Sequence, residues 1–154
     1  MSGPNSASLG LTGSIIITDL IQIIYVSQPF GYDEAVLSGI LLDARTNNTR
    51  DDVTGALVCR QDIYLQLLEG PAPQVKATFA RIRRDDRHLE IKKLVSRQVT
   101  DRIFGDWAML HDPAKSWIWS EEELTKGILD SATEAEIGKV FEDLADRIEN
   151  GAME

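Results

Sequence analysis

The stretch Val53–Leu68, VTGALVCRQDIYLQLL, decides the fold because it holds two short apolar runs separated by one polar pair. Val53–Arg60 and Ile63–Leu68 have the length and composition of strands. Gln61-Asp62 between them predicts a tight turn, so the two strands form a hairpin. Glu69-Gly70-Pro71 then ends the second strand.

One strand and one helix are predicted on the N-terminal side of this hairpin. Leu20–Ser27 is rich in Ile and Val and predicts the first strand. Asp33 can cap the helix that follows, and that helix runs out at Asn47-Asn48. Its apolar residues recur at helical spacing: Val36, Leu37, Ile40, Leu41 and Ala44.

The C-terminal side predicts a second helix, two strands and two further helices. Pro73 suits the first turn of the second helix, which closes at residues 85–88. Strands are expected within Leu89–Thr100 and over Phe104–Leu110. Two capping boxes, Ser120 with Glu123 and Thr133 with Glu136, announce the last two helices.

The predicted order is therefore β-α-β-β-α-β-β-α-α, an α+β fold of the ferredoxin-like, split βαβ type. Two helices lie on one face of a mostly antiparallel sheet, and the two C-terminal helices cover the other. Residues 1–14 are expected to be a flexible arm or an expression remnant, residues 15–112 the main domain, and residues 113–154 a helical extension.

Composition excludes several classes of protein. The formal net charge of −9 argues against a general nucleic-acid binder. One cysteine, Cys59, excludes a disulfide framework and favours a reducing, cytoplasmic location. No apolar run reaches the length of a membrane span, and the N-terminus lacks the basic region of a signal peptide.

The common catalytic motifs are absent, so the sequence predicts that the protein is not an enzyme. There is no GxGxxG, P-loop, HExxH or GxSxG sequence. Two His and one Cys cannot build an ordinary zinc site, and no metal is expected.

Several polar or aromatic residues interrupt the apolar pattern. Alternation places Gln66 on one strand face with Tyr64 and Leu68, and the pattern alone favours a face that touches water. Tyr25, on the first strand, is most simply a core aromatic bonded to the backbone. Trp107 and Met109 share one face of the expected fifth strand, where core packing is the simplest role.

Two polar pairs each allow two interpretations. Asn47-Asn48 is either a helix C-terminal cap or a pair of amides aimed at a heteroaromatic ligand. Residues 85–88, which include Asp85, Arg87 and His88, are either solvated charges at a helix end or contacts to a cofactor.

These features together resemble the BLUF domain, the blue-light sensor that uses FAD. The resemblance rests on the spacing T-G-A-L, eight residues, then Q-x-L-E-G, which runs from Thr54 to Gly70. It continues through Ile82–His88 and Arg102–Met109, and Tyr25 with Ser27 matches the first strand of the family. The residue after the strand tyrosine is often Arg or another polar residue in that family, whereas here it is Val26.

The resemblance implies that residues 15–112 bind FAD, or alternatively FMN, without a covalent bond. Tyr25 stands beside the flavin, Gln66 lies between that tyrosine and the ring, and Asn48 bonds the carbonyl and imide edge. The other residues that it places near the cofactor are Ser27, Asn47, Asp85, Arg87 and His88.

The implied mechanism is a light-driven electron and proton transfer from Tyr25, after which Gln66 rearranges its hydrogen bonds to the flavin. Trp107 and Met109 compete for a place near Gln66 and relay the change to the C-terminal helices. We expect no effector domain after Glu154, as in the short, single-domain members of the family, which act on separate proteins. A homo-oligomer and a response-regulator-like partner are expected on that basis alone.

Two other functions fit a sheet of this kind. One is a light-blind ferredoxin-like protein-interaction module that has lost the cofactor. The other is a small enzyme of the acylphosphatase type, which needs Arg and Asn in a phosphate loop after the first strand. Residues 28–32, QPFGY, offer neither, so this second alternative ranks last.

Overall fold

The computed structural model describes residues 20–29, 34–60, 63–85, 87–112, 122–123 and 126–149. The expected turn at 61–62, the cap at Asp33, residues 1–14 and Ser120 lie outside them. The elements are β1 (Leu20–Pro29), α1 (Glu34–Asp51), β2 (Thr54–Arg60), β3 (Ile63–Pro71), α2 (Ala72–Arg83), β4 (His88–Gln98), β5 (Leu110–Asp112), α4 (Ile128–Ser131) and α5 (Glu134–Glu149). This order confirms the predicted α+β, ferredoxin-like fold.

The strands form one sheet in the order β4-β1-β3-β2-β5. The first four strands pair antiparallel, whereas β5 pairs parallel to β2. The β2–β3 hairpin requires a glycine, because a Cβ on Gly55 would lie 2.0 Å from the carbonyl oxygen of Leu67. The β1–β4 pairing shifts register on both sides of Tyr25 and Val26, which is an irregularity of the β-bulge kind.

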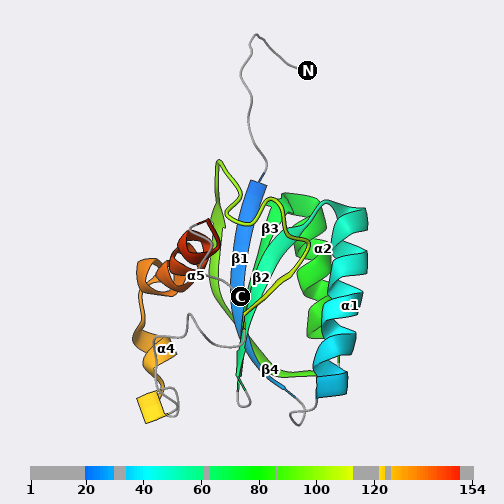
Figure 1. Cartoon of the computed structure of the whole chain (residues 1–154). Coiled ribbons are helices and arrows are strands. Elements are labelled where there is room, and N and C mark those ends of the chain that lie inside the picture. The colour runs from blue at the N-terminus through cyan, green and yellow to red at the C-terminus, as the bar shows by residue number, and fades with distance from the viewer. Residues whose placement is uncertain are drawn as a thin grey trace.

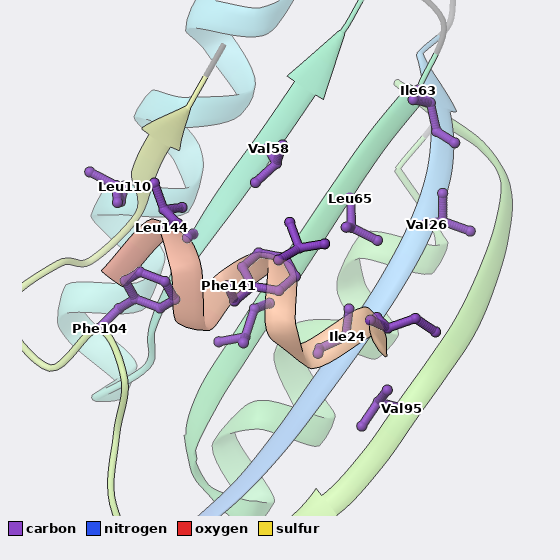
Figure 2. Packing of buried hydrophobic residues seen from close by; sticks show 14 residues of the cluster. Ile24, Val26, Val58, Ile63, Leu65, Val95, Phe104, Leu110, Phe141 and Leu144 are labelled. Carbon is purple, nitrogen blue, oxygen red and sulfur yellow. The ribbon is translucent and has the colours of Figure 1, made fainter. Parts of the chain in front are cut away.

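Helices cover both faces of the sheet (Figure 1). Helices α1 and α2 pack on one face, over a buried cluster that includes Tyr25, Leu57, Leu68 and Met109. Helix α5 packs on the other face through its buried apolar residues, of which Phe141 and Leu144 are labelled in Figure 2. The expectation that C-terminal helices cover the second face is confirmed, and the partly buried Ile128 and Leu129 of α4 pack against the same cluster.

The start of α5 follows the predicted capping box. The backbone N–H of Glu136 donates to Thr133 Oγ1 at 3.0 Å, and the backbone N–H of Thr133 donates to Glu136 Oε1 at 2.8 Å. Each residue thus satisfies a backbone donor that the first helical turn leaves unpaired.

Helix α1 is longer than predicted. It continues through Asn47 and Asn48 to Asp51, so the interpretation of these asparagines as a C-terminal cap is wrong. The left-handed conformation that ends the helix falls instead on Asp52, whose φ is 60°. The two asparagines therefore project their amides from regular helix.

The predicted strand over Phe104–Leu110 is also wrong, because only Leu110–Asp112 forms β5. The backbone N–H of Trp107 donates to the carbonyl of Phe104 at 2.9 Å, which makes a turn where the alternation suggested a strand. Trp107 and Met109 consequently do not share a face: Trp107 is 40% exposed and Met109 is 2% exposed.

Within the part of the chain that the structure describes, no helix has the length and apolarity needed to cross a bilayer.

Replacement of Phe141 by Ala should destabilise the fold by about 3 to 5 kcal/mol, the usual effect of removing a buried aromatic ring. Phe141 is fully buried and meets Phe104 edge-to-face at 6.3 Å between ring centroids. Urea unfolding measures the change, with Glu142→Ala on the exposed side of α5 as the control. Equal unfolding midpoints for the two variants would contradict the packing of α5 on the sheet.

Candidate functional site

A pocket of about 150 Å³ opens between α1 and α2, above the centre of the sheet. Much of its wall is polar, because amides, a hydroxyl, guanidinium groups and carboxylates are among the groups that line it. The lining residues are Ile40, Asp43, Ala44, Asn47 and Asn48 of α1, Gln66 and Leu68 of β3, Thr78, Arg81 and Ile82 of α2, and Asp85, Arg87 and His88.

Gln66 lines this pocket and is bonded to Tyr25, which is fully buried and does not itself line the pocket. They are register partners on β1 and β3, and the Tyr25 hydroxyl donates a hydrogen bond to Gln66 Oε1. Gln66 is 2% exposed because β3 is a central strand covered on both faces. The interpretation that this face of β3 touches water is therefore wrong, and so is a backbone bond as the simplest partner for Tyr25.

The Tyr25 phenol is held neutral. Burial raises the pKa of Tyr25 well above its ordinary value, and the nearby negative charge of Asp85 raises that pKa further. Tyr25 therefore keeps its proton at any physiological pH and presents it to Gln66.

The other end of the Gln66 amide contacts Met109. Gln66 Nε2 donates to Met109 Sδ at 3.5 Å, so the two ends of one amide hold two different side chains. Helix α1 also bonds to the backbone beside this contact: Arg45 Nε donates to the Met109 carbonyl at 3.1 Å, and Asn48 Nδ2 donates to the Ala108 carbonyl at 2.9 Å. Trp107 does not line the pocket.

A charged cluster borders the pocket at the end of α2. Arg87 Nη2 lies 2.6 Å from Asp85 Oδ2 and 2.9 Å from Asp43 Oδ2. The hydrogen bonds from Arg87 lower the pKa of Asp85, so this carboxylate is charged at neutral pH. The cluster thus ties α1 to the segment that follows α2 and fixes the width of the pocket.

His88 lies buried between this cluster and β1. Its Nδ1 is 3.0 Å from Ser27 Oγ. Burial lowers the pKa of His88 to about 4, an effect that Arg87 reinforces and Asp85 opposes. His88 is therefore neutral at physiological pH and completes the site without adding charge.

Several lining residues were not among those predicted from the sequence, and two of them are polar residues of α2. The buried hydroxyl of Thr78 has no hydrogen-bond partner within the described residues, and it faces the pocket. Arg81, which the charge pattern assigns to a solvated face, also lines it. The available signal was the position of Thr78, a polar residue at i+3 from Val75 inside the apolar stripe of α2.

These groups suit a flat heteroaromatic ligand that carries both donors and acceptors. A buried hydroxyl without a partner is unusual unless a ligand or water completes it. The amides of Asn47, Asn48 and Gln66 can each donate and accept. Within the described residues, no group of three or more His, Cys, Asp or Glu side chains forms a metal site.

Comparison with known proteins identifies the class. The chain belongs to the BLUF family, described as sensors of blue-light using FAD, whose family model matches residues 20–110. The fold described above is thus that of a blue-light sensor family that binds flavin.

Individual relatives support the same family. Photoactivated adenylate cyclase subunit beta of Euglena gracilis is 28% identical over 110 residues, which cover 71% of this chain and 12% of that protein. The blue light- and temperature-regulated antirepressor BluF of Escherichia coli is 39% identical over 66 residues, or 43% of this chain and 16% of that protein.

One solved structure matches over nearly its whole length. The dark-state structure of BlrB, a BLUF protein, has a TM-score of 0.68 and 26% identity, and the match covers 85% of this chain and 98% of that one. By contrast, the chain spans about an eighth of the length of the first curated relatives, which are far longer proteins.

The stability of the protein should fall as the pH drops from about 6.5 towards 4. Because the pKa of His88 is lowered from 6.5 to about 4, the folded state favours the neutral ring, and the unfolded chain takes up the proton first. Between pH 7.5 and 4.5 this linkage removes roughly 2 to 3 kcal/mol. Urea unfolding of the wild type and His88→Asn measures the difference, and parallel losses in the two proteins would contradict a buried neutral His88.

Proposed function

We propose that this chain senses blue light through a noncovalently bound FAD, and that Tyr25 and Gln66 form its switch. The observation that carries the proposal is the buried hydrogen bond from Tyr25 to Gln66, whose side chain lines a polar pocket. FAD rather than FMN follows the description of the family, and extraction of the cofactor with mass measurement distinguishes them.

The pocket residues divide into two groups. Gln66, Asn48 and Asn47 supply amides to the polar edge of the flavin ring, and Thr78 adds its unpaired hydroxyl. Asp85, Arg87 and His88 also line the pocket, with Ser27 bonded to His88, and Arg81 adds a positive charge that would suit the polar side chain of the cofactor.

A flavin held by these residues would supply a strong oxidant when it is excited by blue light. Tyr25 is suited to donate an electron, because its proton already lies on a hydrogen bond to Gln66 Oε1 and can leave with that electron. The electron and the proton both return to Tyr25 during the cycle, so Tyr25 is chemically unchanged at its end. What persists is the altered hydrogen bonding of Gln66.

Reorientation of Gln66 carries the change to Met109. In the arrangement described above, Nε2 donates to Met109 Sδ. If the amide turns over, Oε1 faces a thioether sulfur that has no proton to give, and the contact becomes repulsive. Met109 must then move, and the switch becomes a displacement of the backbone that leads into β5.

We propose that residues 15–112 form this sensory unit and that residues 113–154 carry the output. Helix α5, with its predominantly acidic exposed face, is the surface through which a second copy or a response-regulator-like protein is contacted. The relatives named above include a cyclase subunit and an antirepressor, whereas this chain acts as a non-enzymatic cytoplasmic sensor on a separate partner.

Replacement of Tyr25 by Phe should leave flavin bound and abolish the reversible red shift of its absorption band. Phe keeps the ring packing against Phe79, at 5.1 Å between centroids, but removes the proton and the hydrogen bond. A light-minus-dark absorption spectrum of the purified protein measures the result.

Tyr64→Phe is the matched control, because Tyr64 is a second buried tyrosine and belongs to the same buried cluster as Tyr25. This variant should keep the red shift. A red shift retained by Tyr25→Phe contradicts the assigned donor. A colourless wild type favours the light-blind interaction module instead.

Replacement of Met109 by Leu should change the rate of dark recovery by about fivefold. Leu keeps the volume but removes the sulfur acceptor, a bond worth about 1 kcal/mol, which corresponds to that factor in a rate. Recovery after a light pulse is followed at the red-shifted band. The relay is contradicted if neither Met109→Leu nor Met109→Ala alters the spectral change, the recovery or light-dependent assembly.

A further inference from the structure

The segment 103–109 passes from one face of the sheet to the other around the edge of β2. At its start, Phe104 belongs to the cluster beneath α5, and at its end Met109 belongs to the cluster beneath α1 and α2. The backbone N–H of Gly55 on β2 donates to the Trp107 carbonyl at 3.1 Å and holds the middle of the segment against the edge. This segment is therefore the physical link between the pocket and α5.

A buried carboxylate fixes the start of the segment. Glu69 Oε1 accepts the backbone N–H of Ile103 at 2.7 Å, and Oε2 accepts that of Phe104 at 2.6 Å. Thr54 Oγ1 donates to Oε2 at 3.0 Å, and Arg102 Nη1 donates to that hydroxyl at 3.1 Å. Glu69 is 0% exposed and is thus a strong, dry anchor for two consecutive peptide groups.

Glu69 is connected to the pocket through strand β3, which also carries Gln66. Glu69 lies three residues after Gln66 on β3, and strand alternation places it on the opposite face, with Leu65 and Leu67. One central strand therefore holds both ends of segment 103–109: Gln66 contacts Met109 on the pocket side, and Glu69 contacts residues 103 and 104 on the α5 side.

Phe104, whose backbone is held by Glu69, contacts helix α5 with its side chain. Phe104 meets Phe141 of α5 edge-to-face, and both side chains are fully buried (Figure 2). Close-packed interiors transmit displacements rather than absorbing them. A movement of the backbone at Met109 can reach Phe141 through segment 103–109. This requires that the segment pivots about a fixed point near its start and does not slide along the sheet edge.

We propose that Glu69 is a positioning residue that provides this fixed point, so that displacement of Met109 beside Gln66 is passed through Phe104 to α5. The inference rests on the photosensory function proposed above. Glu69 lies outside the pocket. Its proposed role is to couple the light reaction to helix α5, and it takes no part in the light reaction itself.

Glu69→Gln tests this role in the full-length, flavin-loaded protein. The amide keeps the size of the carboxylate but presents an N–H to a backbone N–H, so one of the two anchoring bonds is lost. The absorption red shift should be retained, since Gln66 and Tyr25 are unchanged. The light-minus-dark change in the methyl NMR signals of Leu144, a buried residue of α5, should fall at least about threefold.

Asp52→Asn is the matched control. Asp52 is an exposed carboxylate that pairs with Arg102 at 3.1 Å beside the same segment, and the same chemical change there leaves the Glu69 bonds in place. This control should keep the full response of Leu144. An unchanged Leu144 response in Glu69→Gln, or loss of the red shift in that variant with flavin bound, would overturn the proposed role.

A second measurement keeps the proposal testable if Glu69→Gln folds poorly. In the wild type, the backbone amides of Ile103 and Phe104 should stay protected from hydrogen exchange in dark and light, whereas that of Gly55 should exchange at least about tenfold faster in the light. Loss of protection at residues 103 and 104 on illumination contradicts a fixed point. A wild type without any red shift contradicts the photosensory function instead, which separates the two failures.

Discussion

The hydrogen bond between Tyr25 and Gln66 is the constraint on which the rest of the structure depends. A phenol and a carboxamide buried in a sheet each lose water, and each must find a partner or destabilise the fold. They satisfy one another only because β1 and β3 are neighbours at the centre of the sheet, although 41 positions separate the two residues. The ferredoxin-like order of strands is therefore what brings the two side chains together, in a chain that belongs to the BLUF family of blue-light sensors.

Local pattern predicted the elements whose cause is local. The β2–β3 hairpin, the capping box of α5 and the apolar stripe of that helix all follow from neighbouring residues. The burial of Gln66 could not be predicted in this way, because it depends on which strands flank β3. The end of α1 was missed because Asp52, and not an asparagine, adopts the left-handed backbone conformation.

The segment before β5 was the hardest part to predict, and it is also the part that joins the two sides of the molecule. Alternation of Trp107 and Met109 imitates a strand, whereas the backbone turns after Phe104 and crosses the sheet edge. Such a crossing is set by long-range bonds to Gly55 and Glu69, for which a single segment of sequence carries no signal. The pocket residues were recognised through the spacing of the family motif, whereas Thr78 needed the fold to be noticed.

Helix α1 holds segment 103–109 through the main chain of that segment. Arg45 and Asn48 donate to the carbonyl oxygens of residues 109 and 108, and neither bond uses a side chain of the segment. A carbonyl is the same whatever residue bears it. The side chains at positions 108 and 109 can thus differ while the main-chain bonds to α1 stay the same, so α1 constrains the path of this segment and not its sequence.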